Sequence, residues 1–181
     1  MAINNVLNNA NSLQLVGTAV ASSSAALTFT NLSANFYAYR LVFDSLLAAT
    51  PSGFQLQLST NNGSTWAVNF QWQSLFYNQT IPGWGQAQGG SDNPMQLSGG
   101  ANTPSIILGG EILLVNPMNA STKTYGHANL GYIYNYTGFD YVDNLVADFS
   151  DNTAEATNAV RVSFQTGNIT SGTVKLYGMR A

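Results

Sequence analysis

The feature that most constrains the fold is the alternation of apolar and polar residues in short segments, which is clearest near the C-terminus. Residues 159–180 read AVRVSFQTGNITSGTVKLYGMR. Val160, Val162 and Phe164 alternate with polar residues, the period of a strand that buries one face. The same period returns after the turn-rich segment 167–172. This pattern predicts two strands and a turn that close a sheet by pairing with earlier strands, which leaves fewer free edges.

The same alternation recurs along the chain, and no segment keeps the period of an amphipathic helix over several turns. Asn61-Asn62-Gly63-Ser64 predicts a hairpin turn, because Asn-Gly tolerates positive φ at both central positions. About eight strands with turn signals between them predict an all-β fold, a single antiparallel β-sandwich of jelly-roll-like type. The strands are expected at 26–30, 37–43, 54–59, 66–77, 111–115, 125–136, 160–165 and 174–177.

The domain organisation is predicted as an extended N-terminal arm over residues 1–22 and a sandwich over residues 23–181. A long insertion loop, 78–105, is rich in Gly and Pro, and a segment of this length is a candidate functional or assembly loop. The arm is interpreted as an assembly contact that orders against a partner subunit, with a frayed terminus as the alternative. The arm residues predicted to make this contact are Ile3, Val6, Leu7, Leu13 and Leu15.

Charged residues make up only 7% of the chain, against about 25% in an average soluble domain. Asn, Gln, Ser, Thr and Gly take their place, with 21 Asn among 181 residues. A protein that is packed in an assembly, or that binds neutral sugars, needs less surface charge than one that stays soluble alone. The composition therefore favours these two roles.

Composition also excludes several classes of function. Without Cys there are no disulfides and no thiolate metal sites. Five Lys plus Arg and a net charge of -3 provide too few cations for nucleic-acid binding. No apolar run approaches the ~20 residues of a membrane span, so we expect no membrane insertion. The first 39 residues hold no Lys or Arg, which is unlike a secretory signal peptide and predicts synthesis in a cytoplasm.

Three stretches together resemble a family of phage proteins: YAYRLVFDSLLAATPSGFQLQLSTNNGSTW at 37–66, GGEILLVNPMNASTKTY at 109–125 and NITSGTVKLYGMR at 168–180. They are similar to small proteins of tailed bacteriophages and prophages that carry jelly-roll domains in head fibres, capsid decoration proteins and tail fibres. The resemblance implies a virion protein on the exterior surface of the particle, made in the host bacterial cytoplasm. It further implies a homo-oligomer, expected to be a trimer, that contacts the major capsid protein or other virion proteins. It supplies no catalytic residues.

Catalytic chemistry has little support in the sequence. His127 is the one His, and no G-x-S-x-G motif accompanies it. The few acids include Glu111, which is expected to pair with an Arg or cap a turn rather than cleave glycans. We therefore expect no enzymatic activity and no cofactor. A solvated acidic face is expected near the C-terminal third, with a weak calcium site as the alternative; its candidate ligands are Asp140, Asp143, Asp148 and Asp151.

Aromatic and amide side chains offer a different chemistry, because aromatic rings stack on the apolar faces of sugars. Trp84 lies between two glycines in the long loop, and with Tyr77, Gln86 and Gln88 it forms the predicted contact site for a ligand or partner. Its alternative role is to fill a pocket on a neighbouring subunit. Two functional hypotheses follow: a structural protein on the exterior of a phage particle, or a tail-fibre adhesin or carbohydrate-binding module that recognises host surface glycans.

Overall fold

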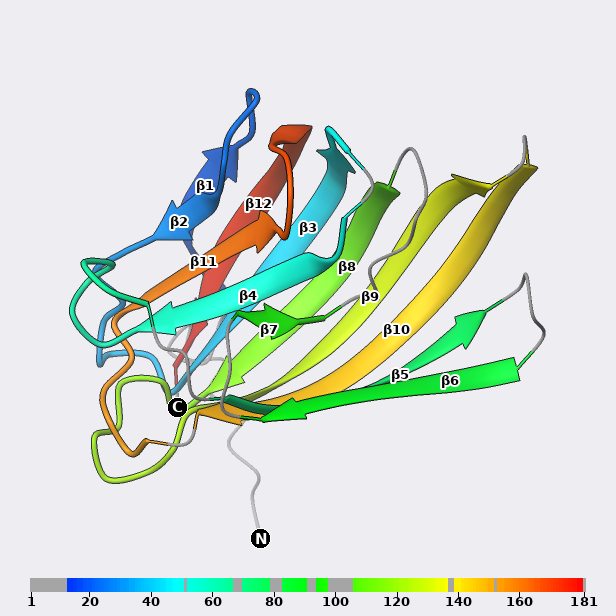
Figure 1. Cartoon of the computed structure of the whole chain (residues 1–181). Helices are drawn as coiled ribbons and strands as arrows, with labels where there is room; N and C mark the ends of the chain where they lie inside the picture. The colour runs from blue at the N-terminus through cyan, green and yellow to red at the C-terminus, as the bar shows by residue number, and fades with distance from the viewer. Residues whose placement is uncertain are drawn as a thin grey trace, which may run out of the picture.

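The structure is a computed structural model that describes residues 13–50, 52–66, 70–78, 83–90, 94–97, 106–136, 139–151 and 153–180, some strand residues by backbone alone. The described chain is built from strands (Figure 1). None of these residues forms a helix long and apolar enough to cross a membrane. The strands are β1 (Leu13–Val20), β2 (Leu27–Phe29), β3 (Ala38–Ala48), β4 (Phe54–Ser59), β5 (Phe70–Asn78), β6 (Gly83–Gly90), β7 (Met95–Gln96), β8 (Ile106–Val115), β9 (Tyr125–Tyr136), β10 (Phe139–Asp151), β11 (Ala159–Phe164) and β12 (Ile169–Met179).

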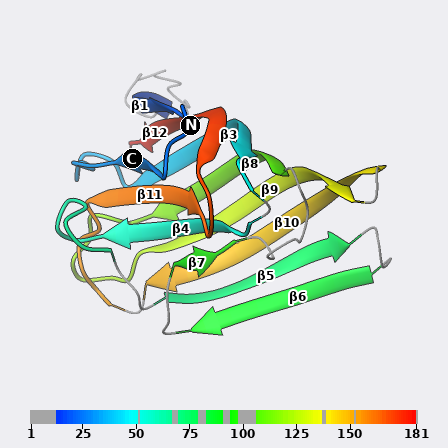
Figure 2. The same ribbon diagram turned by 45° about the horizontal axis from the view of Figure 1, so that its top comes forward.

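The strands form two antiparallel sheets of unequal size. The large sheet has eight strands in the order β1-β12-β3-β8-β9-β10-β5-β6, and the small sheet has four in the order β2-β11-β4-β7. The small sheet lies over the large one, while the ends of β9 and β10 and the β5–β6 hairpin extend past it (Figures 1 and 2). This architecture confirms the predicted all-β sandwich.

The core lies between the sheets, where the inward faces of their strands meet. Phe54, Leu56 and Leu58 of β4 are fully buried and alternate with Gln55 and Gln57, as the sequence pattern predicts. Phe54 makes edge-to-face contacts with Phe43 of the large sheet, at 5.4 Å between ring centroids, and with Phe164 at 5.7 Å. Each buried side chain of this size contributes about 1.5–3 kcal/mol to stability.

The predicted C-terminal pair of strands is present, but the two strands do not form a hairpin. β11 pairs with β2 and β4 in the small sheet, and β12 pairs with β1 and β3 in the large one. The chain crosses between the layers at residues 165–168, where Gln165 N donates to Gly53 O and Ala49 N donates to Asn168 O, both at 2.8 Å. Alternation shows which face of a strand is buried but not which sheet it joins, and this explains the difference.

The predicted turn at Asn62-Gly63 exists, with φ of 60° and 88° at these two residues. It leads from β4 in the small sheet toward β5 in the large one, so it is not the hairpin turn that the sequence predicts. Amide groups hold it in place: Asn62 N donates to Asn158 Oδ1, and Asn31 N donates to Asn62 Oδ1, both at 2.7 Å. The Asn-rich composition thus serves the loops between the layers.

Three segments in which the sequence predicts no strand contain strands in the structure. Residues 13–20, assigned to the N-terminal arm, form β1 and pair with β12. The predicted insertion loop 78–105 contains β6, which pairs with β5, and the short β7, which pairs with β4. The acidic segment that begins at residue 139 forms β10, a central strand of the large sheet. Glycines in β6 and acids in β10 conceal the alternation, because both residue types are uncommon in strands.

A buried tyrosine fastens the segment before β3 to the core. Tyr39 is fully buried, and its ring makes an edge-to-face contact with Phe36 at 5.5 Å. Its hydroxyl donates to Ser33 O at 2.8 Å and accepts a hydrogen bond from Ser33 N. Burial raises the pKa of Tyr39 above its ordinary value, and the hydrogen bond to Ser33 offsets part of this effect.

We expect Tyr39→Phe to lower the free energy of unfolding by about 1–3 kcal/mol, because Ser33 loses its partner. The pKa of Tyr39 is higher in the folded protein than the value of about 10 for an unfolded tyrosine. Its contribution to the free energy of unfolding is therefore fully present below about pH 10 and is lost as pH rises through the folded-state pKa. Urea unfolding of both proteins between pH 7 and pH 11 should therefore show the stability gap narrowing above pH 10. A gap that is constant or widens would contradict this role of Tyr39.

Candidate functional site

A straight row of polar residues crosses four strands on the outer face of the large sheet. The register pairs Gln88 of β6 with Gln73 of β5, Gln73 with Asp148 of β10, and Asp148 with His127 of β9. Directly paired residues on adjacent strands point to the same side of a sheet, and all four are exposed. At about 4.8 Å per strand the row is about 14 Å long. We call these four residues the polar row.

Two neighbouring rows flank the polar row. On one side the register pairs Gln71 with Ser150, and on the other it pairs Leu75 with both Gln86 and Val146. Four glutamines, Gln71, Gln73, Gln86 and Gln88, therefore stand at alternate positions of one hairpin and are all exposed.

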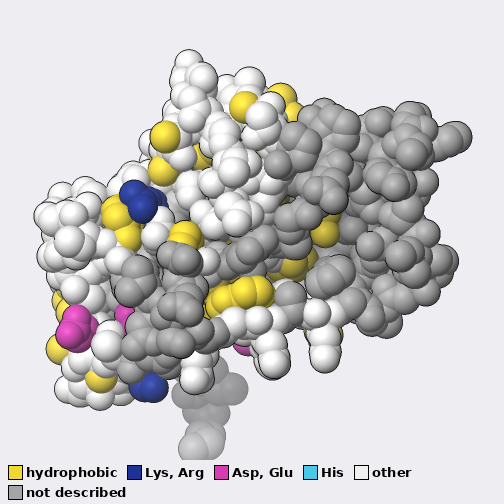
Figure 3. All heavy atoms as spheres, in the orientation of Figure 1, with side chains coloured by type: hydrophobic (Ala, Val, Ile, Leu, Met, Phe, Trp, Pro, Cys, Tyr) yellow, Lys and Arg dark blue, Asp and Glu magenta, His cyan; other side chains and the backbone are white. Residues whose placement is uncertain are grey.

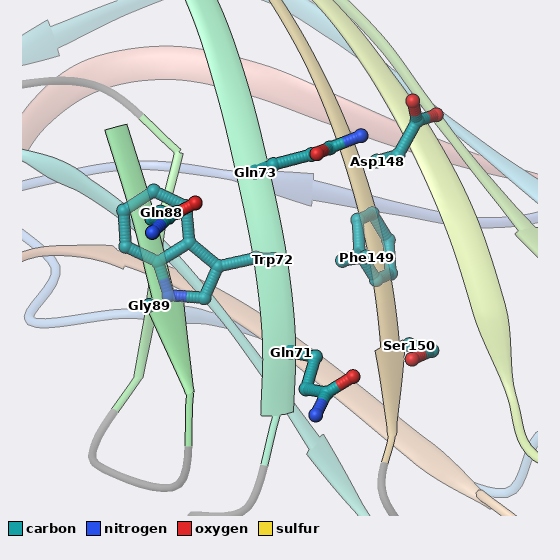
Figure 4. A pocket seen from close by; sticks show the side chains of 8 residues that line it. All are labelled: Gln71, Trp72, Gln73, Gln88, Gly89, Asp148, Phe149 and Ser150. Atoms are coloured by element: carbon teal, nitrogen blue, oxygen red, sulfur yellow. The ribbon is translucent and has the colours of Figure 1, made fainter. Parts of the chain in front are cut away.

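The surface is hollowed along these rows. A hollow of about 680 Å³ is lined by Gln71, Gln73, Gln88, Asp148 and Ser150, together with the intervening Trp72, Gly89 and Phe149. Figure 4 shows Gln73 directed from β5 toward Asp148 on β10. A smaller hollow of about 150 Å³ adjoins it over Leu75, Gln86 and Val146. Hydrogen-bonding groups thus line a shallow depression on a rigid sheet.

The charges on this face are largely paired. Asp148 Oδ1 lies 2.9 Å from His127 Nδ1. Glu111 of β8 accepts from Arg40 Nε of β3 at 2.8 Å and also pairs with the Arg40 Nη2 group, which confirms the predicted pairing of Glu111 with an arginine. Both pairs are partly exposed, so each contributes at most about 1 kcal/mol. Their main effect is to leave the face without a concentrated charge.

A tryptophan and a glycine pack closely on the opposite face of the β5–β6 hairpin from the four glutamines. Trp72 is half-buried against the core, and its indole extends from β5 toward β6 (Figure 4). A Cβ on Gly89 would lie 2.4 Å from the indole Nε1, so the close approach needs glycine. Elsewhere, the guanidinium of Arg161 lies 4.3 Å from the centre of the Trp66 ring.

The predicted contact residues fall on the same hairpin. Gln86 and Gln88 line the hollows, so the structure brings them together with residues of β5 and β10. Tyr77 and Trp84 occupy directly paired positions two residues beyond the Leu75–Gln86 pair, but their side chains lie outside the described part of the structure. Gln71, Gln73 and their neighbours on β10 were not predicted as contact residues. The sequence pattern that could have identified them is the Gln-x-Gln motif, which occurs at both 71–73 and 86–88.

Of the four acids proposed as alternative calcium ligands, the structure describes the side chains of Asp148 and Asp151. Asp148 is exposed on the outer face of β10, whereas Asp151 is buried and accepts hydrogen bonds from the N–H and hydroxyl of Thr153 at 3.1 and 3.0 Å. The side chains of Asp140 and Asp143 lie outside the described residues. No cluster of three metal-binding side chains occurs among the described residues. Asp148 and Asp151 stand three residues apart on one strand, so their carboxylates point to opposite faces and do not come together.

The edge strand β1 exposes apolar side chains and carries no charge. Among the described strands it pairs within its sheet only with β12, and every residue in it is exposed or half-buried. Of the residues predicted for assembly, Leu13 and Leu15 belong to this strand, while Ile3, Val6 and Leu7 lie outside the described residues. We call its four exposed apolar residues the β1 strip. They are Leu13 (43% exposed), Leu15 (51%), Val16 (42%) and Val20 (68%).

The surface on the side of the small sheet is also poor in charge. Figure 3 shows a few isolated basic and acidic side chains among uncoloured polar atoms and scattered apolar ones. Exposed single apolar residues are ordinary on protein surfaces. The two distinctive surfaces are thus the β1 strip and the amide-lined hollows.

No model of a known protein family matches the sequence, and no curated protein sequence matches it. Among solved structures, the chain is similar to CG-16, a homodimeric agglutinin from chicken liver, with 13% identity, a TM-score of 0.34 and coverage of 83% of this chain and 98% of the agglutinin. It is also similar to the catalytic domain of an endo-1,3-β-glucanase (laminarinase) from Thermotoga petrophila RKU-1, with 9% identity, a TM-score of 0.26 and coverage of 86% and 69%. A third is an aerolysin-like protein of Bombina maxima, with 12% identity, a TM-score of 0.14 and coverage of 84% and 88%. At these TM-scores the similarity supports no conclusion about function.

Proposed function

We propose that this chain is a non-enzymatic structural protein on the exterior of a tailed-phage particle, in the role of a capsid decoration protein or head fibre. The three stretches that resemble phage jelly-roll proteins support this proposal, as does a surface with few charges. The protein acts by adhesion: it forms a homo-oligomer, a trimer in our proposal, and adds contact area to the major capsid protein or to another virion protein.

The β1 strip is the observation that carries the proposal. Proteins protect the edge of a sheet with Lys, Pro or a covering element, since an open edge invites another chain. β1 carries no charged residue and no Pro, and its four apolar side chains are 42–68% exposed. Such an edge suits a subunit whose β1 is covered in an assembly.

Adhesion of this kind needs no catalytic group, and its strength comes from repetition. Apolar contact contributes about 25 cal/mol per Å² that is removed from water. A modest contact in each subunit becomes strong when symmetry repeats it, because later contacts form at high effective concentration. The rigid two-sheet body keeps the contact surface in a fixed geometry.

The first test is the mass of the purified protein in solution, measured by light scattering at two concentrations. We expect a trimer near three times 19.3 kDa. Leu15→Lys combined with Val20→Lys should shift it toward monomer, because two ammonium groups would be buried in the subunit contact. A matched control is Ser121→Lys, which adds charge at an exposed turn before β9 and should leave the mass unchanged.

Binding to particles provides the second test. Purified protein mixed with empty capsids of a tailed phage that encodes it should sediment with them, and the two-lysine variant should sediment less. A protein that stays monomeric, and that binds neither capsids nor other virion parts, would contradict the structural role. If the two-lysine variant trimerises like the wild type, the β1 strip is not part of the subunit contact. The trimer itself would not be contradicted by that result.

A second candidate function is a tail-fibre or receptor-binding adhesin, or a carbohydrate-binding module, that recognises host surface glycans. The amide-lined hollows over β5, β6 and β10 favour it, because they offer hydrogen-bonding groups at an open surface. The two candidates are compatible, since a head-borne sandwich can also hold surface sugars.

A further inference from the structure

The polar row and its flanks form a regular grid of hydrogen-bonding groups. Gln73 and Gln88 face each other across β5 and β6, and Gln71 stands two residues from Gln73 on the same strand. Each carboxamide offers two donors and an acceptor with two lone pairs. Neighbouring amides on paired strands therefore match the donors and acceptors of neighbouring hydroxyl groups.

The charges of the residues that line the two hollows indicate which class of ligand can bind there. Among the described residues, no Lys or Arg lines either hollow, whereas an anionic ligand such as a phosphate or a uronic acid calls for such residues. The carboxylate of Asp148, which lines both hollows, already pairs with His127 at 2.9 Å. The hollow therefore favours an uncharged ligand that carries many hydroxyl groups.

Apolar side chains complete the surface. Leu75 is 51% exposed beside the smaller hollow, and Tyr125, which pairs with Ser150 across β9 and β10, is also 51% exposed. Apolar and aromatic side chains of this kind pack against the C–H faces of sugar rings, while polar groups bind the hydroxyls. A surface that combines amide groups with exposed apolar side chains is suited to a saccharide rather than to a purely polar solute.

We propose that the outer face of the large sheet over β6, β5, β10 and β9 binds a neutral oligosaccharide that lies across the strands along the polar row. Gln73 and Gln88 are its central hydrogen-bonding residues, and the Asp148–His127 pair binds a further sugar at one end. This inference deepens the second candidate function and rests on an adhesive role. The site lies on the opposite side of the large sheet from the core, about 14 Å long by strand spacing.

The experiment is an array of neutral and acidic oligosaccharides, followed by titration calorimetry with the best neutral ligand. We expect wild-type binding, and a five- to tenfold loss of affinity for each of Gln73→Ala and Gln88→Ala, the value of one or two lost hydrogen bonds. Gln165→Ala removes an exposed glutamine between β11 and β12 and should bind as the wild type does. Equal melting temperatures will show that all variants fold.

Two additional arms locate the site and define the ligand. Gln88→Glu keeps the size of the side chain but adds a charge, and it should weaken binding without changing the fold. Affinity should be equal at 50 mM and 500 mM salt, because a neutral ligand gains nothing from screened charges. Trp84→Ala measures the contribution of the predicted contact residue on the same hairpin.

Three outcomes would overturn the inference: no binding of any neutral glycan, binding of acidic glycans alone, or unchanged affinity in the Gln73→Ala Gln88→Ala double variant. If the third outcome is accompanied by loss of binding in Trp84→Ala, the binding site lies elsewhere on the hairpin. A protein that binds no glycan yet trimerises and sediments with capsids would retain the structural function alone.

Discussion

The fold depends on the burial of two apolar sheet faces against each other. Phe54, Leu56 and Leu58 in the small sheet pack toward the inner face of the large one, and the ring contacts of Phe43, Phe54 and Phe164 join the layers directly. With 7% charged residues and few ion pairs among the described residues, this burial has little electrostatic support. It follows that the outer faces contribute little to stability and are free to carry binding chemistry.

The two sheets differ in size, and this difference shapes the surface. Four strands cannot cover eight, so the large sheet extends past the small one (Figures 1 and 2). Its two edge strands have different character: β1 exposes aliphatic side chains, whereas β6 presents glutamines and glycines. One edge is suited to contact with protein and the other to contact with hydroxyl-rich molecules. A single sandwich can therefore combine attachment with recognition.

The sequence predicts much of the fold because strand alternation is a local property. The strands at 54–59 and 125–136 have the predicted bounds, and Trp72 packs where an apolar residue among polar neighbours is expected to pack. The pairing of strands is not local, and so the separation of β11 from β12 into different sheets was not predicted. β10 was missed because its inward residues alternate with acids and Asn, which are uncommon in strands.

The candidate site was predicted in part for the same reason. Gln86 and Gln88 were identified from residue type and from their position in a Gly-rich segment. Gln73 and Asp148 were not linked with them, because only the register of β6, β5 and β10 brings the three strands into one row. Residues that form a row across several strands are far apart in the sequence, so no local sequence pattern reveals the row.

The pairing of β1 with β12 has a consequence for how the chain is made. These strands come from opposite ends of the described sequence, as do β2 and β11 in the other sheet. Loop closure over such separations is slow relative to local pairing. On the ribosome, neither sheet can be completed until the final strands have emerged, so the nascent chain carries unpaired strand edges throughout synthesis. Holding chaperones or low temperature should therefore raise the yield of folded protein more than they would for a helical chain of this length.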